Sequence, residues 1–416
     1  MNRITILVFI AGAAAQGFPS TCPQGLPQNP NATIGVCPTD FTLIGPELEA
    51  IHESKNAPTG FAVDRDLNIY LTYPRNFGAT PVNVAKATGF ASEEPWPNAA
   101  IQNCTVGQDP AECFINVQNV VLDALGQLWV LDSGIPPGAK TAVSRGAKVV
   151  AFSQAGLSIR NYVIPDDFFF DNMNANDLRI NNTLGAGGYA FITDASASGS
   201  LLAINLDDGA VTRRLHNTTV TKADPKFVGS YNGEPLYAWN GTKKSYATTG
   251  ADGIALASGN LYWGVLASRR YYFISQETLI NSSLSDEGML SAVQDPGELG
   301  SEQAGFSADD RGRVYMLASE QNAIYYVDTQ QSEVSEEING TPPGGTGPVP
   351  TENYFVKTLV RSGLIQHADS AAVLDGWLYF CTNQLELSPI RQYKNVDARK
   401  GPFRSYRTWI GRGPAV

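Results

Sequence analysis

The chain has 416 residues, of which 43% are hydrophobic and 17% are charged, and its formal net charge is -11. This negative surface field repels polyanions, so composition argues against nucleic acid and anionic membranes as partners. The hydrophobic content is ample for a large core, and no change of composition divides the chain, so we expect one large domain.

The first 15 residues have the features of a secretory signal peptide. Arg3 precedes an apolar run from Ile4 to Ala15 that ends in three alanines, the pattern of a charged head, an apolar core and a small-residue cleavage site. The run is too short to span a bilayer, and no later segment has about 18 consecutive apolar residues. We expect a signal peptide over 1–15 and one domain over 16–416, secreted or in the secretory-pathway lumen; a buried N-terminal strand is the alternative.

The five cysteines agree with an oxidising compartment. Cys22 with Cys37 and Cys104 with Cys113 form two locally spaced pairs. No Cys-x-x-Cys spacing occurs, so these pairs predict disulfides rather than zinc sites. Cys381 is left over in an apolar stretch, where we expect a buried and inert thiol.

Seven Asn-x-Ser/Thr sequons suggest a glycoprotein, and each would place its asparagine on an exposed loop if it carried a glycan. Their asparagines are Asn31, Asn103, Asn181, Asn217, Asn240, Asn281 and Asn339.

A pair of short strands recurs six times along the chain. Each copy has an apolar strand, a turn rich in Asp, Gly and Asn, and a second strand that carries an aromatic residue. Such small sheets are apolar on both faces and bury them only by stacking radially, which predicts an all-β, six-bladed propeller. The copies run from Gly60 to Tyr70, from Asn119 to Trp129, from Asp177 to Phe191, from Gly253 to Tyr262, from Gly305 to Tyr315 and from Ser370 to Tyr379.

We interpret the aromatic residues of these copies as packing between blades, with a ladder for ligand stacking as the alternative. Helical signal is limited to a turn or two at Glu47 to Glu53 and around Gln276 to Leu279. The segment from Ser332 to Asn353 is rich in Glu, Pro and Gly and predicts a mobile surface loop between two blades.

Several further blocks resemble the yellow and major royal jelly protein family, in its fungal branch, over most of the chain from Gly60 to Val396. The resemblance implies a secreted propeller with a small-molecule site in the channel mouth. Insect relatives include dopachrome-converting isomerases and amine-binding proteins, and the fungal branch includes hetero-Diels-Alderases that join tropolone quinone methides to humulene-type sesquiterpenes. The blocks are Val121 to Asp132, Asn176 to Leu178, Tyr189 to Asp194, Leu266 to Tyr271 and Leu378 to Asn383.

Aligning the six copies places one equivalent position at the entrance of each innermost strand, where side chains converge on the propeller axis. These positions could hold a ligand or an ion, with Asn119, Asp177 and His367 close behind; capping of strand ends is the alternative. The ring positions are Thr59, Gln118, Asn176, Asp252, Ala304 and Asp369.

No cofactor is expected, although Asn176, Asp252 and Asp369 supply hard oxygen ligands that would suit a structural calcium ion. The pattern is similar to lactonase-type propellers, which hold a divalent cation with a Glu, an Asn and an Asp. Thr59 stands where a Glu would be needed, which argues against a metal-dependent lactonase.

A second set of residues lies three positions beyond each aromatic, and we expect it at the opposite end of the channel, with Asp132 and Asp194 in structural roles. The chain has only three histidines and no Gly-x-Ser-x-Gly motif, P-loop or zinc-ligand cluster, which excludes a serine nucleophile. His367 could act as an acid or donor, and Arg269 could reach an anionic or carbonyl oxygen; both have an ordinary structural alternative.

The leading hypothesis is a hetero-Diels-Alderase acting on small apolar or phenolic substrates. The reaction needs orientation of two apolar partners and a donor on the developing oxyanion, but no nucleophile. We expect His367, Arg269 and Gln118 to be catalytic. The expected substrate contacts are Thr59, Tyr73, Asn119, Asn176, Asp252, Trp263, Phe306, Asp369 and Asn383.

Two alternatives remain open at this point. A dopachrome-type tautomerase would use a carboxylate or His367 to move a proton on a quinone-like ring. A binding protein without turnover would hold amines or phenols against Asp252 and Asp369. A buried, unpaired carboxylate favours the tautomerase, and an aromatic box around paired acids favours the binding protein.

Overall fold

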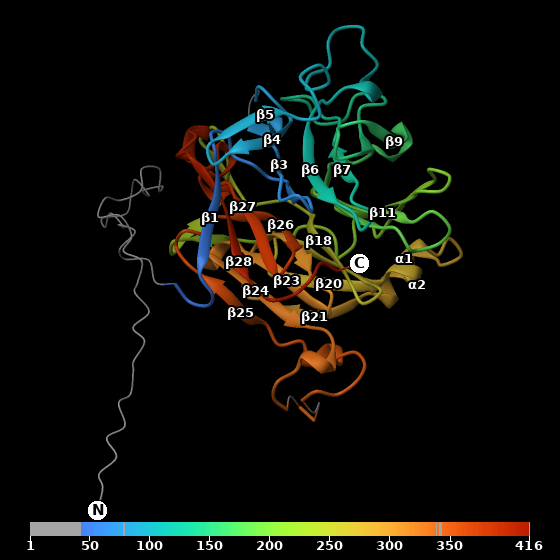
Figure 1. Cartoon of the computed structure of the whole chain (residues 1–416), viewed down its shortest axis with the longest axis vertical. Helices are drawn as coiled ribbons and strands as arrows, with labels where there is room; N and C mark the ends of the chain where they lie inside the picture. The colour runs from blue at the N-terminus through green and yellow to red at the C-terminus, as the bar shows by residue number, and fades with distance from the viewer. Residues whose placement is uncertain (1–42, 78–79, 338, 341–342, 416) are drawn as a thin grey trace, which may run out of the picture.

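The computed structural model describes residues 43–77, 80–337, 339–340 and 343–415. Within these ranges the chain forms six four-stranded antiparallel sheets around a common axis, which confirms the six-bladed, all-β propeller (Figure 1). Two additional two-stranded hairpins, β14–β15 and β16–β17, project from the connection between the third and fourth blades.

Each blade is numbered here by its place along the chain, and its strands run from the channel outward. Blade 1 contains β2 (Phe61–Val63), β3 (Ile69–Thr72), β4 (Val84–Gly89) and β5 (Ser92–Pro95); blade 2 contains β6 (Val117–Leu122), β7 (Leu128–Asp132), β8 (Lys148–Phe152) and β9 (Ser158–Val163); blade 3 contains β10 (Ala175–Asn181), β11 (Tyr189–Asp194), β12 (Ser200–Asn205) and β13 (Val211–Arg214).

The remaining elements follow in the second half of the chain. The hairpin strands are β14 (Gly229–Tyr231), β15 (Glu234–Leu236), β16 (Ala238–Asn240) and β17 (Lys243–Ser245); blade 4 contains β18 (Ala251–Ala257), β19 (Asn260–Val265), β20 (Arg270–Ser275) and β21 (Gln294–Glu298), with α1 (Gln276–Ile280) and α2 (Asp286–Ala292) before β21; blade 5 contains β22 (Gln303–Ala308), β23 (Arg313–Ala318), β24 (Ala323–Asp328) and β25 (Lys357–Arg361); blade 6 contains β26 (Ala368–Leu374), β27 (Trp377–Thr382), β28 (Phe403–Trp409) and β1 (Leu48–Ser54).

The sixth blade joins the two ends of the propeller. Its outermost strand is β1, which pairs with β28 from Leu48 opposite Thr408 to Ser54 opposite Phe403, and Figure 1 shows blue β1 beside red β28. The helical turn predicted for Glu47 to Glu53 is therefore wrong. The backbone hydrogen bonds offered by the edge of β28, and the burial of His52, outweigh a weak local helical preference.

The predicted repeats coincide with the two inner strands of each blade, and their aromatic residues are buried between blades. Tyr70 of blade 1 packs with Val120 of blade 2, and this pattern continues around the ring. The last interface closes it, because Tyr379 of blade 6 stacks on Phe61 of blade 1 at 6.4 Å. The interpretation as inter-blade packing is confirmed.

The aspartate of the repeated turn holds the aromatic residue that follows six positions later. Asp123 accepts hydrogen bonds from the Gln127 backbone (2.7 Å) and from Trp129 Nε1 (2.8 Å). Asp309 accepts one from the hydroxyl of Tyr315 at 2.8 Å. These bonds satisfy a buried carboxylate and orient the ring toward the neighbouring blade.

Two local predictions have different outcomes. Helix α1 begins at Gln276 as expected, where the Ser275 hydroxyl accepts from the backbone of Thr278. The segment from Ser332 to Asn353 does not divide two blades, because it joins β24 to β25 inside blade 5. Val334 and Val349 anchor it in the core between blades 4 and 5, and long hairpin loops of this kind are invisible to a repeat search on inner strands.

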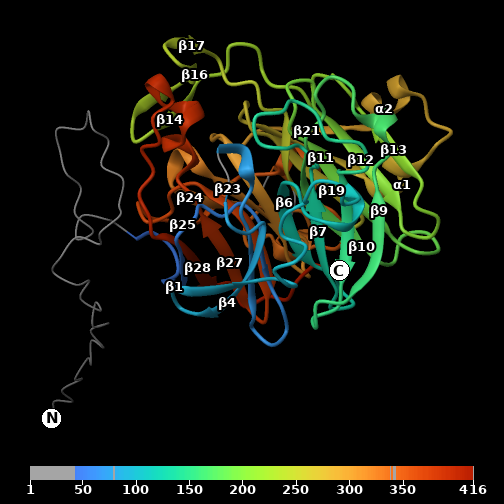
Figure 2. The same ribbon diagram turned by 90° about the horizontal axis from the view of Figure 1, so that it is seen from above.

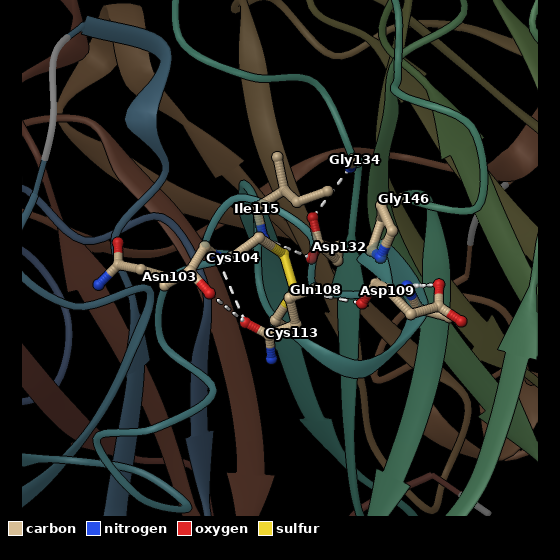
Figure 3. The surroundings of a disulfide bond; sticks show 12 residues. Asn103, Cys104, Gln108, Asp109, Cys113, Ile115, Asp132, Gly134 and Gly146 are labelled. Carbon is tan, nitrogen blue, oxygen red and sulfur yellow. Dashed lines mark hydrogen bonds between the residues drawn. A yellow bond between two sulfur atoms is a disulfide. The ribbon is translucent and has the colours of Figure 1, made fainter.

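The predicted disulfide between Cys104 and Cys113 is present and closes a loop before β6 (Figure 3). Cys381 is buried with a free thiol, as expected, and burial raises its pKa far above the usual range. The predicted pair of Cys22 and Cys37, the sequon at Asn31 and the signal peptide over 1–15 lie outside the described residues.

The described sequon asparagines are exposed, with one exception. Asn181 is 9% exposed at the end of β10, and its amide donates to Gln276 Oε1 at 2.7 Å, so the expectation of an exposed loop is wrong there. The exposed ones are Asn103, Asn217, Asn240, Asn281 and Asn339. Among the described residues no helix is long and apolar enough to cross a membrane.

Candidate functional site

The ring positions converge on one cavity of about 340 Å³ at one end of the central channel. The hairpin strands β16 and β17, at the top of Figure 2, belong to this end of the channel, because Ala238 of β16 lines the cavity. The predicted ring is therefore assembled as expected. The residues from the six blade entrances that line the cavity are Thr59, Gln118, Asn176, Asp252, Ala304 and Asp369.

An irregular strand pairing recurs at these positions in blades 2 to 6. The register of each innermost strand shifts across the ring residue, for example between Ala251 and Ile254 and between Ala368 and Ala371. Such bulges bend a strand and redirect a side chain. The repeated bulge thus turns the ring side chains toward the channel.

Close approach of the inner strands brings neighbouring ring positions together. A Cβ atom added to Gly305 would lie 1.7 Å from the backbone oxygen of Asp369, so only glycine fits between blades 5 and 6. Ala304, beside Gly305, is the smallest ring residue. The small side chain of Ala304 leaves space between Asp252 of blade 4 and Asp369 of blade 6.

Hydrogen bonds connect the ring across blade boundaries. Asn176 Nδ2 of blade 3 donates to Asp252 Oδ1 of blade 4 at 2.7 Å. Asn119 of blade 2, which lines the cavity as predicted, donates to the carboxylate of Asp177 in blade 3. Thr59 donates to the backbone oxygen of Gln118 at 2.7 Å. These hydrogen bonds between blades hold the polar side chains of the cavity in place.

Three carboxyl groups of the cavity have raised pKa values. Burial, and then repulsion from Asp369, Asp177 and Glu302, raises the pKa of Asp252 well above its ordinary value. Burial raises the pKa of Asp369 to about 7, although nearby His367 opposes the shift. Burial also raises the pKa of Asp177, against the attraction of Arg179. Burial in the cavity thus favours the protonated form of these acids, and Asp369 titrates near neutral pH.

His367 and Asn383 support Asp369 from behind the cavity wall. Asn383 Nδ2 donates to Asp369 Oδ2, and His367 Nε2 lies 3.9 Å from the same oxygen. His367 is 1% exposed, and its Nδ1 lies 2.9 Å from Glu386 Oε1. Neither residue lines the cavity, so both act on a ligand only through Asp369.

Besides His367 and Asn383, four residues expected in the channel lie elsewhere. Tyr73, Trp263 and Phe306 are fully buried between blades, because side chains of the packed sheets point to the neighbouring blade and not to the axis. Tyr73 hydrogen bonds Glu93 at 2.5 Å, and Trp263 donates to the Val220 backbone at 2.8 Å.

Arg269 is also outside the cavity. It forms a bidentate ion pair with Glu320 at 2.6 and 2.8 Å, and its guanidinium lies over the ring of Phe227. An arginine engaged in this way is a structural group.

Asp132 and Asp194 are structural, but the channel end predicted for their set is wrong. Asp132 pairs with Val117 and Asp194 with Ala175, at the starts of the inner strands, because antiparallel pairing brings the end of the second strand beside the start of the first. Asp132 accepts from the Ile115 backbone (Figure 3) and pairs with buried Lys148 at 2.8 Å. Asp194 pairs with Arg213 at 2.8 Å.

Three charged residues near the cavity were missed by the sequence reasoning. Arg391 lines the cavity and pairs with Glu302 at 2.6 Å, and Glu386 lies behind Asp369. Glu302 and His367 stand two positions before Ala304 and Asp369, so extending the repeat alignment by two residues would have found Glu302. Arg391 and Glu386 come from the irregular loop after β27, which has no counterpart in the repeats.

A second cavity of about 340 Å³ lies toward the other ends of the inner strands, where Leu256, Ala308 and Leu374 line it. Arg179 lines this second cavity, whereas its partner Asp177 lines the first. The guanidinium of Arg179 reaches from blade 3 to the Phe306 backbone oxygen of blade 5 and pairs with Asp177 at 3.2 Å. This side chain separates the two halves of the channel.

The calcium hypothesis gains no support from the geometry. In the ranges that the structure covers, no three His, Cys, Asp or Glu side chains are grouped so that they could hold a metal ion. Asn176 directs its amide nitrogen, not its oxygen, at Asp252.

Several solved structures are similar to this chain. A luciferin-regenerating enzyme is 14% identical with a TM-score of 0.50, covering 89% of this chain and 98% of that chain. An aldose sugar dehydrogenase from Streptomyces coelicolor is 10% identical, with a TM-score of 0.48, covering 89% and 99% of the two chains. A gluconolactonase from Xanthomonas campestris is 11% identical, with a TM-score of 0.46, covering 87% and 89%. The first likeness shows a shared propeller fold, because identity is too low to transfer more.

No curated protein sequence is similar enough to count as a relative. The family model described as "Major royal jelly protein" matches residues 115–340. This match spans more than half of the 416 residues, and the chain therefore belongs to the major royal jelly protein family.

Proposed function

We propose that the channel cavity is the active site of an isomerase that moves a proton between two atoms of a small quinone- or enol-type ring compound. The observation that carries this proposal is the pair of acids at the entrances of blades 4 and 6. Asp252 and Asp369 face one cavity, where burial raises the pKa of both acids and brings that of Asp369 to about 7. A pair of carboxyl groups in such a site can share the roles of acid and base. The family resemblance to secreted isomerases supports the same reaction class.

The reaction needs only protein groups. Ionised Asp369 takes a proton from a carbon or hydroxyl of the ring, and the electron pair moves through the conjugated system. Protonated Asp252 then donates its proton to the atom that gained electron density. The ring is isomerised with no change of oxidation state, and exchange with water returns both acids to their starting states.

Phenylpyruvate, which enolises, and an aminochrome are suitable probes, each followed by its absorbance. We expect Asp369→Asn and Asp252→Asn each to lower turnover by about 10²- to 10⁴-fold. The exposed turn residue Asp207 provides a control, since Asp207→Asn also removes one negative charge and leaves turnover unchanged. Rates equal to the uncatalysed rate for all probes would exclude the proposal.

The cycloaddition implied by the resemblance to fungal Diels-Alderases is the second candidate. It is favoured by an apolar part of the wall formed by Leu266, Leu385 and Ile390, with Gln118 as an amide donor nearby. Orientation of an ortho-quinone methide and a humulene alcohol there would lower the entropic cost of their encounter. A chiral adduct formed equally well by wild type, Asp369→Asn and Asp252→Asn would support cycloaddition over proton transfer. Binding of amines without turnover would support the third possibility, a binding protein that has no catalytic activity.

A further inference from the structure

His367, Glu386 and Asp369 form a line of buried titratable groups that ends at the cavity. Glu386 belongs to the 3-10 turn Leu385–Leu387 after β27, and His367 directly precedes β26. Glu386 Oε1 lies 2.9 Å from His367 Nδ1, and His367 Nε2 lies 3.9 Å from Asp369 Oδ2. Asp369 side-chain exposure is 19%, against 1% for His367 and 4% for Glu386. Only the last group of the line meets the cavity.

The backbone fixes this arrangement. His367 has φ 53° and Gln384 has φ 57°, a left-handed conformation that costs free energy unless other contacts maintain it. The amides of Asn383 and Gln384 donate to the oxygens of His367 and Gln366, both at 3.1 Å. The loop that carries Glu386 is thereby held against the residues that carry His367.

Buried polar atoms without a hydrogen-bond partner gather in the same place. Buried polar groups are normally paired, so a concentration of exceptions indicates a site with a role beyond folding. Over the described residues, the atoms of this cluster that lack a partner are His367 Nε2, Glu386 Oε2, Glu302 Oε2 and Arg391 Nη1.

We propose that Glu386 and His367 are positioning residues that control the protonation of Asp369 from behind the cavity wall. This inference rests on the function proposed above, because it assigns a role to the groups that support its base. Glu386 holds the imidazole with Nδ1 toward itself and Nε2 toward Asp369. His367 in its charged form stabilises the Asp369 carboxylate, so that the base ionises near neutral pH.

The charges around Asp369 agree with this role. Burial lowers the pKa of His367, but Glu386, followed by Asp369 and Glu302, outweighs it and raises the pKa above the ordinary value. Without a cation, burial and the neighbouring acids would keep Asp369 protonated. The groups that act on Asp369 or on its neighbours in this cluster are His367, Glu386, Asp177, Asp252, Glu302, Arg391 and the thiol of Cys381.

The first test is the pH profile of turnover in His367→Gln. We expect the rising limb, which reports ionisation of Asp369, to move up by about one pH unit or more, with a smaller change in the plateau rate. His52→Gln is a matched control, because His52 is also buried and lies 2.8 Å from a carboxylate, Glu93, on outer strands. An unmoved limb in His367→Gln, or an equal shift in His52→Gln, would overturn the proposal.

Two readouts do not depend on turnover, so they separate failure of this inference from failure of the proposed function. The first is the carboxyl band of ¹³C-labelled Asp369 in infrared spectra, assigned by difference from Asp369→Asn, which should titrate at higher pH in His367→Gln. The second is NMR of labelled histidines, of which the chain has three. In Glu386→Gln the pKa of His367 should fall. An unchanged titration of His367 would overturn the proposed role of Glu386.

Discussion

Asn176 Nδ2 lies 2.7 Å from Asp252 Oδ1, although the two residues are 76 positions apart and belong to different blades. The bond joins the entrances of β10 and β18. It supplies the side-chain hydrogen bond that lowers the pKa of Asp252 against the stronger effect of burial.

Asn176→Asp should make stability depend on pH more strongly than it does in the wild type. The new carboxyl cannot donate to Asp252 when it is ionised, and repulsion in the cavity raises its pKa in the folded state. The folded protein then binds more protons than the unfolded chain, so stability is retained at low pH and lost as the pH rises through the folded-state pKa. We expect a loss of about 1–3 kcal/mol at pH 8 relative to pH 5, measured by urea unfolding. Equal losses at both pH values would contradict this.

Asp369→Asn should remove a pH dependence that the wild type has. Burial raises the pKa of Asp369 from 3.8 to about 7, so its contribution to stability is present below 3.8 and is lost as the pH rises through about 7. The thermal midpoint of the wild type should fall across this window more than that of the variant. The control Asp207→Asn should behave like the wild type.

Filling the two ends of the channel should have different effects. Ala304 and Ala308 lie on the same strand, β22, and line the first and the second cavity respectively. Ala304→Trp should abolish ligand binding, whereas Ala308→Trp should leave it within about twofold. Calorimetric titration of both variants with one ligand checks this. A loss of binding in Ala308→Trp alone would contradict this prediction, because it would place the ligand in the second cavity.

Cys104→Ser combined with Cys113→Ser should destabilise the protein by about 2–3 kcal/mol, because the disulfide closes a short loop with a sequence separation of 9. Reductant should lower the unfolding midpoint of the wild type more than that of the double variant, which keeps only the predicted Cys22–Cys37 pair. Cys381→Ala controls for the buried thiol, and its response to reductant should match the wild type.

The repeat predicted more of the molecule than any single motif did. Equivalent positions such as Asn176 and Asp369 were placed on one ring, because the inner strands share a direction and an alternation of side chains. The same alternation explains why aromatic residues predicted to line the channel are buried instead. Trp263 follows Tyr262 on a strand whose two faces both pack against neighbouring blades, so both side chains belong to the core.

Loop residues were beyond the reach of that reasoning. Glu386 and Arg391 reach the site through a segment that has no periodic pattern and whose path depends on tertiary contacts. The structural role of Asp132 could be predicted from the sequence, but its position along the channel could not. That position depends on the antiparallel register, in which Asp132 pairs with Val117, and the alignment of the copies carries no information on this register.

The pairing of β1 with β28 also has a consequence for biosynthesis. The earliest strand of the propeller waits for a partner that is synthesised about 350 residues later, which takes roughly 20 to 70 s at about 5–20 residues per second. During that interval a nascent polypeptide exposes the unpaired edge of β1 and the apolar flanks of its first and latest sheets. The propeller can therefore close only after β28 has been synthesised, and we expect chaperones that shield strand edges to bind the chain until then.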